Sequence, residues 1–225
     1  MSEPDDILTI DIVSDVLCPW CYLGEKRLEA ALAAAPQTVA IRWRPYQLDP
    51  TIPDGGLDRA EYLARKFGKS NRVDAVHDNL ARLGAEFGLA FAFDRIKRSP
   101  NTLDAHRLIR WAGSAGAQAR VVDRLFKAYF VEGRDIGDHA VLIDVARECG
   151  LDAELVGKLL AQGADADLVR REIAQAQAIG VSGVPFFIFA GRLAVPGAQE
   201  PSVLLSAMAQ ARQATKTPAS EAPVA

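Results

Sequence analysis

The sequence predicts an α/β fold: a mixed four-stranded sheet interrupted by a large all-helical insertion. Three observations predict it. The first 45 residues have the pattern of a strand, a helix and a second strand, and strand-like residues return only near residue 184. The long region between them has helical periodicity and almost no strand character. A chain of 225 residues can hold this insertion within one compact fold.

The N-terminal elements follow from local sequence. "ILTIDIV" (residues 7–13) is short and rich in β-branched residues, which predicts a strand. A helical pattern then runs from Pro19 to about Ala34, and proline suits a first helical position because its missing N–H would have no partner there. "TVAIRWR" (residues 38–44) alternates apolar and polar residues and predicts a second strand. The short joints indicate a right-handed βαβ unit with parallel strands.

The helical insertion follows a segment dense in proline and glycine, "PYQLDPTIPDGG". Stretches such as "RVVDRLFKAYFVEG" have helical periodicity, most of them end in glycine, and several begin after Asp, Ser or Asn. They predict six or seven helices. We therefore divide the chain into residues 1–56, the N-terminal part of the sheet domain; 57–179, a helical insertion domain; and 180–213, the C-terminal part of the sheet domain.

The C-terminal part begins with "VPFFIFA" (residues 184–190), which predicts a strand. A turn at Gly191 and Arg192 followed by "LAV" predicts an antiparallel hairpin, and "PSVLLSAMAQARQA" predicts a closing helix with Pro201 in its first turn. Residues 214–225 lack apolar periodicity and are expected to be disordered. Without the insertion, this layout is thioredoxin-like.

Composition and charge exclude several classes of function. The formal net charge is −3 and no basic stripe alternates with aromatic residues, so nucleic-acid binding is not expected. The acidic N-terminus does not resemble a secretory signal, and the longest apolar runs are too short to span a bilayer. We therefore expect a cytoplasmic protein without membrane contact. In that compartment a cysteine pair usually binds metal or performs chemistry.

Such a pair occurs in "SDVLCPWCYLGEKRLEAAL", where Cys18 and Cys21 flank the first turn of the predicted N-terminal helix. Free backbone N–H groups and the helix dipole favour an anion at Cys18, which is expected to be the attacking thiolate. Cys21 shares a helix face with Gly24 and Leu28, so it should be partly buried and act as the resolving thiol. Close approach of this helix to the sheet would explain a glycine at position 24.

The pair has two other interpretations. A zinc site normally needs four ligands, but there is no second CxxC, and the three histidines and Cys149 lack ligand spacing. We therefore expect no metal. Two simply buried cysteines would not require a Pro-Trp dipeptide at a helix start, so this interpretation is also disfavoured.

A second motif, "GVSGVPFFIF", places Pro185 at the start of a strand. A cis Val184–Pro185 bond would turn the chain there and free the backbone N–H and C=O of Val184 to bind an extended peptide. An ordinary trans proline at a strand entry fits the residues equally well.

"SDVLCPWCYLGEKRLEAAL", "NTLDAHRL" and "GVSGVPFFIFAGRLAVPGAQ" together resemble the DsbA-like thioredoxin superfamily, specifically its FrnE-like branch. That branch is akin to 2-hydroxychromene-2-carboxylate isomerases, and the resemblance covers residues 7–212. It implies a thioredoxin fold with a helical insertion, a nucleophilic Cys18, a resolving Cys21 and a cis Pro185 facing them. It also implies thiol–disulfide exchange on protein or low-molecular-weight substrates, without a bound cofactor.

Departures from the family refine this expectation. Exported DsbA proteins carry a signal peptide, so a cytoplasmic reductase, isomerase or redox-protection role fits better. Hydroxychromene isomerases have serine at the Cys18 position and use glutathione. This chain keeps both cysteines, but a glutathione-dependent isomerase or transferase is retained as the alternative, with glutathione a candidate co-substrate. A non-enzymatic redox-sensing module is the second alternative. A monomer and a homodimer are both compatible with the sequence.

Pro19 and Trp20, between the cysteines, are expected to shape the substrate groove together with Val184 and Pro185. Asn101 matches a motif shared with the isomerases and could contact glutathione, although a helix N-cap explains it better. Asp15 is interpreted as a loop residue that needs no proton-relay role. The three histidines are assigned to helix surfaces or caps.

Overall fold

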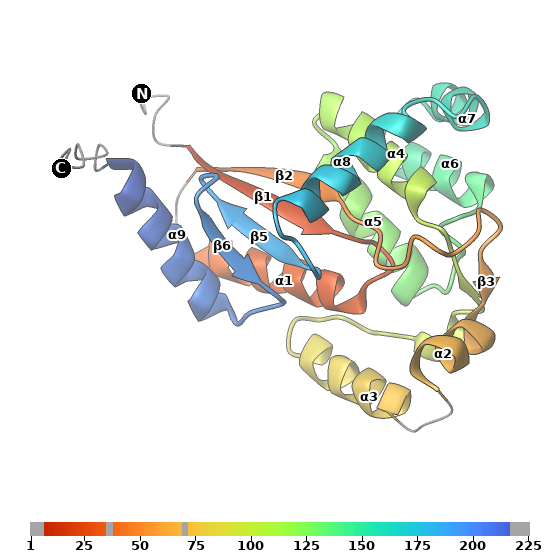
Figure 1. The fold of residues 1–225 in the computed structure, drawn as a ribbon, viewed down its shortest axis with the longest axis horizontal. Coiled ribbons are helices and arrows are strands. Elements are labelled where there is room, and N and C mark those ends of the chain that lie inside the picture. Colours follow the sequence, from red (N-terminus) through yellow and green to blue (C-terminus); the bar gives the residue numbers. More distant parts are fainter. Residues whose placement is uncertain (1–6, 35–37, 69–71, 217–225) are drawn as a thin grey trace.

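The computed structural model describes residues 7–34, 38–68 and 72–216, and it confirms the predicted sheet. Its elements outside the insertion are β1 (Leu8–Ser14), α1 (Pro19–Ala34), β2 (Val39–Pro45), β5 (Phe186–Phe189), β6 (Leu193–Pro196) and α9 (Pro201–Lys216). The strand order is β2-β1-β5-β6, with β2 parallel to β1 and the other neighbours antiparallel. The sheet is therefore mixed and four-stranded (Figure 1).

Two boundaries differ from the predictions. β5 begins at Phe186 rather than at residue 184 because Pro185, immediately before it, has no N–H to donate to the ladder. Residues 214–216 of the predicted disordered tail belong to α9, which runs to Lys216. The rest of that predicted tail lies outside the described residues.

Seven helices lie within the predicted insertion in the described part of the chain. They are α2 (Arg59–Phe67), α3 (Arg72–Ala85), α4 (Leu103–Ser114), α5 (Gln118–Phe130), α6 (His139–Glu148), α7 (Ala153–Ala161) and α8 (Ala166–Ala178). A two-stranded sheet of β3 (Leu57–Asp58) and β4 (Arg98–Ser99) was not predicted, because two-residue strands leave no periodic signal. A 3₁₀ turn spans Phe93–Arg95.

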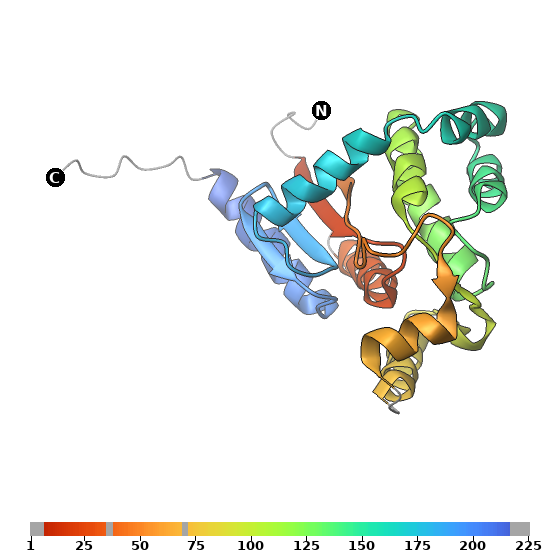
Figure 2. The same cartoon turned by 45° about the vertical axis from the view of Figure 1, so that its right-hand side comes forward.

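Helices cover both faces of the sheet. α1 and α9 pack side by side on one face, and α8 crosses the other face next to β2, while α4 to α7 lie beyond the β2 edge (Figures 1 and 2). Successive side chains of a strand point to opposite faces of the sheet, so each strand contributes side chains to the helix layers on both faces. Ile12 and Phe187 belong to the main core, whereas Val13 and Phe186 belong to a second cluster with Ala176 of α8. None of the described helices combines the length and apolarity needed to cross a bilayer.

Helix α1 carries an unusual buried carboxyl group. Glu25 is 5% exposed and its Oε2 has no hydrogen-bond partner. Burial raises the pKa of Glu25 well above its usual range, and Asp123 raises it further, while Lys26 lowers it. The protonated form is therefore favoured by folding. The resulting stabilisation of the folded protein is complete below a pH of about 4.3, the pKa of a glutamate in the unfolded chain. It is lost as the pH rises through the pKa that Glu25 has in the folded protein.

We expect Glu25→Gln to be more stable than the wild type by about 1–3 kcal/mol at pH 8, because a buried charge is no longer formed. Near pH 4 the two proteins should have the same free energy of unfolding, measured by urea denaturation. Glu154→Gln, which removes an exposed ion pair with Lys158 on α7, serves as the control and should change little at either pH. An equal difference at both pH values would contradict the assignment.

Candidate functional site

The two cysteines lie where β1 ends and α1 begins. After Ser14 the chain turns, with the Cys18 N–H donating to the Asp15 carbonyl at 3.0 Å, and α1 starts at Pro19. The first turn of α1 contains no acidic residue, so no carboxylate within the helix offsets the positive end of its dipole beside Cys18. The Cys21 N–H donates to the Cys18 carbonyl at 3.0 Å. The start of the helix thus stacks Cys21 one turn behind Cys18.

Both sulfurs are free thiols in this structure, and they interact with each other. Cys18 is 3% exposed and Cys21 is 1% exposed. Burial raises the pKa of Cys21 well above its usual range, and hydrogen bonding and charge interaction with Cys18 raise it further. Ser14 and the backbone of Asp15 act in the opposite direction and lower the pKa of Cys21. Cys21 is therefore the inner, protected thiol, as its position on the helix face predicted.

Val184 and Pro185 lie against the start of α1, Val184 at Cys18 and Pro185 at Gly24. The Val184–Pro185 peptide bond is cis, which confirms the conformation implied by the family resemblance. The Cys18 thiol donates to the Val184 carbonyl, with 3.6 Å between Sγ and O. The register between β1 and β5 explains this contact between Cys18 and Val184. Val13 pairs with Phe186, so the residues after β1 and those before β5 lie at the same end of the sheet. Four of the predicted site residues are thereby brought together from opposite ends of the sequence.

Gly24 permits this close packing, as its sequence position suggested. A Cβ at residue 24 would lie 2.9 Å from Pro185 Cγ and 3.3 Å from Phe187 Cζ. Both distances are shorter than ordinary van der Waals contact. Helix α1 can therefore lie on the Pro185 segment only because residue 24 has no side chain.

We expect Gly24→Ala to slow about tenfold the disulfide exchange that the family resemblance implies, because separating α1 from Pro185 displaces Cys18 from Val184. Stability should fall by about 1 kcal/mol, since the cost of overpacking exceeds the gain in helix propensity. Gly113→Ala in α4 is the matched control: its Cβ would meet only the flexible Gln118 side chain, at 3.4 Å. The control should be slightly more stable and fully active. Equal behaviour of the two variants would contradict the packing argument.

Pro19 and Trp20 stand on the solvent side of the pair. Both are half-buried, and Trp20 packs partly against the main core. Val184 is half-buried as well, whereas Pro185 is buried. The more exposed residues of the site, which form its accessible rim, are therefore Pro19, Trp20 and Val184.

The side chain of Asn101 is held by hydrogen bonds to neighbouring segments of the protein. Its Oδ1 accepts hydrogen bonds from the N–H of Leu103, the first residue of α4, and from Gln47 Nε2, both at 2.9 Å. Its Nδ2 donates to the Ile52 carbonyl at 2.7 Å. These bonds use both ends of the amide. The N-cap residue of α4 is Thr102 rather than Asn101, although Asn101, one residue earlier, accepts from the first N–H of the helix. No described contact joins Asn101 to either cysteine of the pair.

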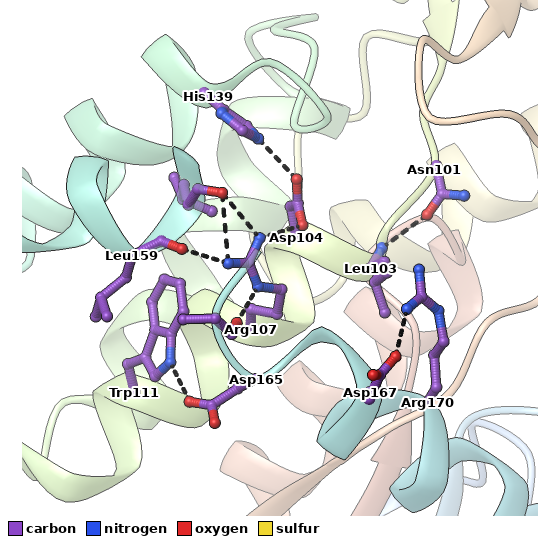
Figure 3. Close-up of polar contacts among 12 residues, drawn as sticks. Asn101, Leu103, Asp104, Arg107, Trp111, His139, Leu159, Asp165, Asp167 and Arg170 are labelled. Atoms are coloured by element: carbon purple, nitrogen blue, oxygen red, sulfur yellow. Dashed lines mark hydrogen bonds and ion pairs between the residues drawn. The ribbon is translucent and has the colours of Figure 1, made fainter. Parts of the chain in front are cut away.

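Next to Asn101 is a cavity of about 350 Å³ whose lining includes Asp104, Arg107 and His139 but none of the cysteine-site residues. Figure 3 shows its principal polar contacts. Arg107, 1% exposed, donates to the carbonyls of Leu159 and Ala164 at 2.5 Å each and to Asp104 at 2.6 Å. Arg107 therefore caps the C-terminal end of α7 and holds it to α4. Its donors are used for structure rather than for a ligand.

The structure corrects the assignment of His106 to a helix surface. His106 is 3% exposed, and its Nε2 lies 2.8 Å from the Tyr46 carbonyl and 3.4 Å from Asp15 Oδ1. Asp15, interpreted as a loop residue, is fully buried and accepts hydrogen bonds from the N–H groups of Leu17 and Leu48. The signal for His106 was its spacing of three residues from both Leu103 and Ile109, which places it on the apolar face of α4.

The other two histidines also have partners. His77 stacks on Phe93 with 3.9 Å between ring centroids, and burial lowers its pKa. His139 is exposed at the first position of α6, and its Nε2 lies 2.7 Å from Asp104 Oδ2. Cys149 is buried, as expected for a small apolar residue, and donates to the Arg120 carbonyl.

Among the described residues, one group of side chains has metal-ligand spacing. Oxygens of Glu25, Glu29 and Asp123 lie within 4.8 Å of one another. Lys26 Nζ already pairs with Glu29 at 2.9 Å and with Asp123 at 2.6 Å, so an ammonium group occupies the cation position. Neither Cys18 nor Cys21 belongs to this group.

Comparison with known proteins identifies relatives of the whole fold. The family model described as a DSBA-like thioredoxin domain matches residues 9–209. The crystal structure of a probable DsbA oxidoreductase from Streptomyces coelicolor is 33% identical, with a TM-score of 0.83 over 97% of this chain and 93% of that one.

Two more distant structures share the fold. One is a 2-hydroxychromene-2-carboxylate isomerase, at 21% identity and a TM-score of 0.69, covering 92% of this chain and 98% of the other. The second is the cytosolic disulfide reductase DsbM from Pseudomonas aeruginosa, at 21% identity and a TM-score of 0.59, covering 92% and 97%. Another solved structure of DsbM includes glutathione.

Proposed function

Because the chain belongs to the DsbA-like thioredoxin domain family, we propose that it is a thiol–disulfide oxidoreductase of the FrnE-like branch that uses Cys18 and Cys21. The observation that carries the proposal is the pair itself. Two free, interacting thiols sit at the start of α1, and the outer one contacts the Val184 carbonyl from the opposite end of the chain. A structural cysteine pair would need neither the helix terminus nor that contact.

The proposed reaction has two exchanges. The Cys18 thiolate attacks one sulfur of a substrate disulfide, so that a Cys18–substrate disulfide forms, the substrate S–S bond breaks and one substrate thiolate leaves. The Cys21 thiolate then attacks the Cys18 sulfur, and the second substrate thiolate leaves. Two electrons have passed to the substrate, and Cys18 and Cys21 are joined by a disulfide. The same steps in reverse oxidise a dithiol.

Substrate docking is assigned to the accessible rim of the site. The Val184 carbonyl lies next to Cys18, and the Val184 backbone can pair with an extended peptide, as the edge of a sheet does. Pro19 and Trp20 provide apolar contact on the other side of the sulfur. Such a site accepts protein disulfides as well as small ones, because most of the recognition uses backbone groups that every peptide has.

We place the reaction in the cytoplasm, with glutathione as the candidate reductant. Two glutathione thiols would reduce the Cys18–Cys21 disulfide and leave as glutathione disulfide, which balances the cycle. The retention of both cysteines supports this role over isomerase chemistry, in which a single residue at position 18 would be sufficient.

Turnover with glutathione tests the proposal. The purified protein should accelerate reduction of the disulfides of insulin, followed by turbidity, and reduction of a small mixed disulfide of glutathione, followed through glutathione reductase and NADPH. No acceleration with either substrate, by a protein whose two thiols titrate as free, would reject the oxidoreductase function. Isomerisation of a hydroxychromene carboxylate in the same preparation would instead favour the isomerase.

A further inference from the structure

The loop that leads to Cys18 is fixed by a buried carboxylate group. Asp15, the first residue after β1, is fully buried. Its backbone carbonyl accepts the Cys18 N–H at 3.0 Å, and its Oδ1 accepts the Leu17 N–H at 3.2 Å. These two hydrogen bonds close a tight turn over residues 15–18. The position of Asp15 therefore determines where the backbone of Cys18 lies.

Asp15 also binds the segment that follows β2, residues 46–52. Its Oδ2 accepts the Leu48 N–H at 2.6 Å. Two residues earlier in this segment, the Tyr46 N–H donates to the Ser14 carbonyl at 3.0 Å, which continues the pairing of β2 with β1. The turn before Cys18 and the segment of residues 46–52 are therefore joined at Ser14 and at Asp15.

Helix α4 of the insertion binds the same segment. His106 is 3% exposed, and its Nε2 lies 2.8 Å from the Tyr46 carbonyl. Because a carbonyl can only accept, Nε2 carries the hydrogen. The same nitrogen lies 3.4 Å from Asp15 Oδ1. Just before α4, the side chain of Asn101 accepts a hydrogen bond from Gln47. The insertion therefore holds residues 46–52 at two points, and at one of them it also faces the buried carboxylate.

The burial of Asp15 is unfavourable unless its partners compensate it, because a carboxylate loses its hydration when it leaves water. The compensation lasts only while the N–H groups of Leu17, Leu48 and His106 stay in place. A buried polar network whose members are all satisfied permits one arrangement of its segments and disfavours others. The arrangement here leads directly to Cys18, whose sulfur contacts the Val184 carbonyl.

On the basis of the proposed oxidoreductase function, we propose that Asp15 and His106 are positioning residues for Cys18. Together they hold the turn before Cys18, residues 46–52 and α4 in one arrangement, which keeps the Cys18 sulfur beside the Val184 backbone where the substrate docks. Neither side chain takes part in bond making or breaking. The insertion thereby contributes to the reactivity of a cysteine that lies outside it.

The attack by Cys18 can be measured alone in a protein with one thiol. The parent protein for this experiment is the full chain carrying Cys21→Ser and Cys149→Ser. It is mixed with an excess of 5,5′-dithiobis(2-nitrobenzoate) at pH 7 in a stopped-flow instrument. Attack by Cys18 forms a mixed disulfide and releases one coloured thiolate, so the rate of this release is the rate of attack.

Loss of either positioning residue should slow the release by at least about tenfold. His106→Leu removes the N–H that bonds to Tyr46 and faces Asp15. Asp15→Asn turns one acceptor oxygen into a donor, which would face a backbone N–H instead of accepting from it. Because both residues act through the same contacts, the double variant should be within about twofold of the slower single variant.

Two further variants separate positioning from a general loss of packing or charge. His106→Gln keeps a side-chain N–H at about the reach of the imidazole Nε2 and should restore the release to within about threefold of the parent rate. Asp11→Asn is the matched control for Asp15→Asn. Asp11 is also a buried carboxylate, four residues earlier in the chain, but it pairs with Arg42 and Arg44 rather than with the turn. This control should stay within about twofold of the parent rate.

The outcomes distinguish the positioning role from the function on which it rests. If the folded Asp15→Asn or His106→Leu protein releases thiolate as fast as the parent, the positioning role is overturned while the proposed function stands. A release as slow in His106→Gln as in His106→Leu would also overturn it, since the loss would then be one of packing. No release from the parent protein would instead reject attack by Cys18. If Asp15→Asn does not fold, the comparison of His106→Leu with His106→Gln decides.

Discussion

Cys18→Ser is expected to abolish disulfide reduction, with a loss of at least about a thousandfold in kcat/KM for insulin. Serine fits the space and can still contact the Val184 carbonyl, which Cys18 now reaches at 3.6 Å. However, its hydroxyl cannot form the mixed disulfide on which both exchanges depend. Folding should be nearly unaffected, so the loss is chemical rather than structural.

Cys149→Ser is the matched control for this loss. Cys149 is also a buried free thiol that donates to a carbonyl, that of Arg120, but it lies in the insertion, at the C-terminal end of α6. Its replacement should leave kcat/KM within about twofold. A Cys18→Ser protein that keeps substantial activity would contradict the nucleophilic role. If that activity is glutathione-dependent isomerisation, it would support the alternative function.

Arg107→Met is expected to lower the free energy of unfolding by about 3 kcal/mol or more, measured by urea denaturation. The substitution keeps the volume of the side chain but removes donors to the carbonyls of Leu159 and Ala164, and it leaves Asp104 without this partner. Arg107→Lys should recover little, because one ammonium group cannot reproduce the planar fork (Figure 3).

Arg170→Met, on neighbouring α8, provides the comparison. Arg170 is 56% exposed and pairs only with Asp167 in the same helix, so its loss should change stability by about 0.5 kcal/mol or less. Reductase activity of the folded Arg107→Met protein should remain close to that of the wild type, since no described contact links Arg107 to the cysteines. An Arg107→Met protein as stable as Arg170→Met would contradict the capping role.

Local pattern was sufficient to predict most of the fold. The strand at residues 7–13 and the helix from Pro19 were found within one residue because each has a clear period and a clear boundary residue. Gly24 indicated that the helix packs closely on the sheet, because glycine in the middle of a helix is destabilising relative to alanine unless close packing requires it. The cysteine pair was equally visible, since a CxxC at a strand-to-helix junction has few other uses.

What sequence reasoning missed depends on contacts between distant segments. His106 appeared to be one of three unremarkable histidines, because nothing local shows that α4 turns it towards Asp15, 91 positions earlier in the numbering. Asp15 does lie in the loop after β1, as predicted, but nothing local shows that it is buried there and accepts hydrogen bonds from the N–H groups of Leu17 and Leu48. The cis form of Val184–Pro185 could not be chosen from its own residues and was implied only by the family resemblance.

Trapping with Cys21→Ser tests most directly the two roles assigned to the sulfurs, attack by Cys18 and resolution by Cys21. When the inner thiol cannot resolve, the exchange should stop after its first step, and substrate should remain attached to Cys18. We expect non-reducing electrophoresis and peptide mass spectrometry to find disulfide-linked partners on residue 18, which disappear with dithiothreitol and are absent from Cys18→Ser/Cys21→Ser. Adducts found on Cys149 instead, or no adduct while the wild type turns over, would contradict attack by Cys18.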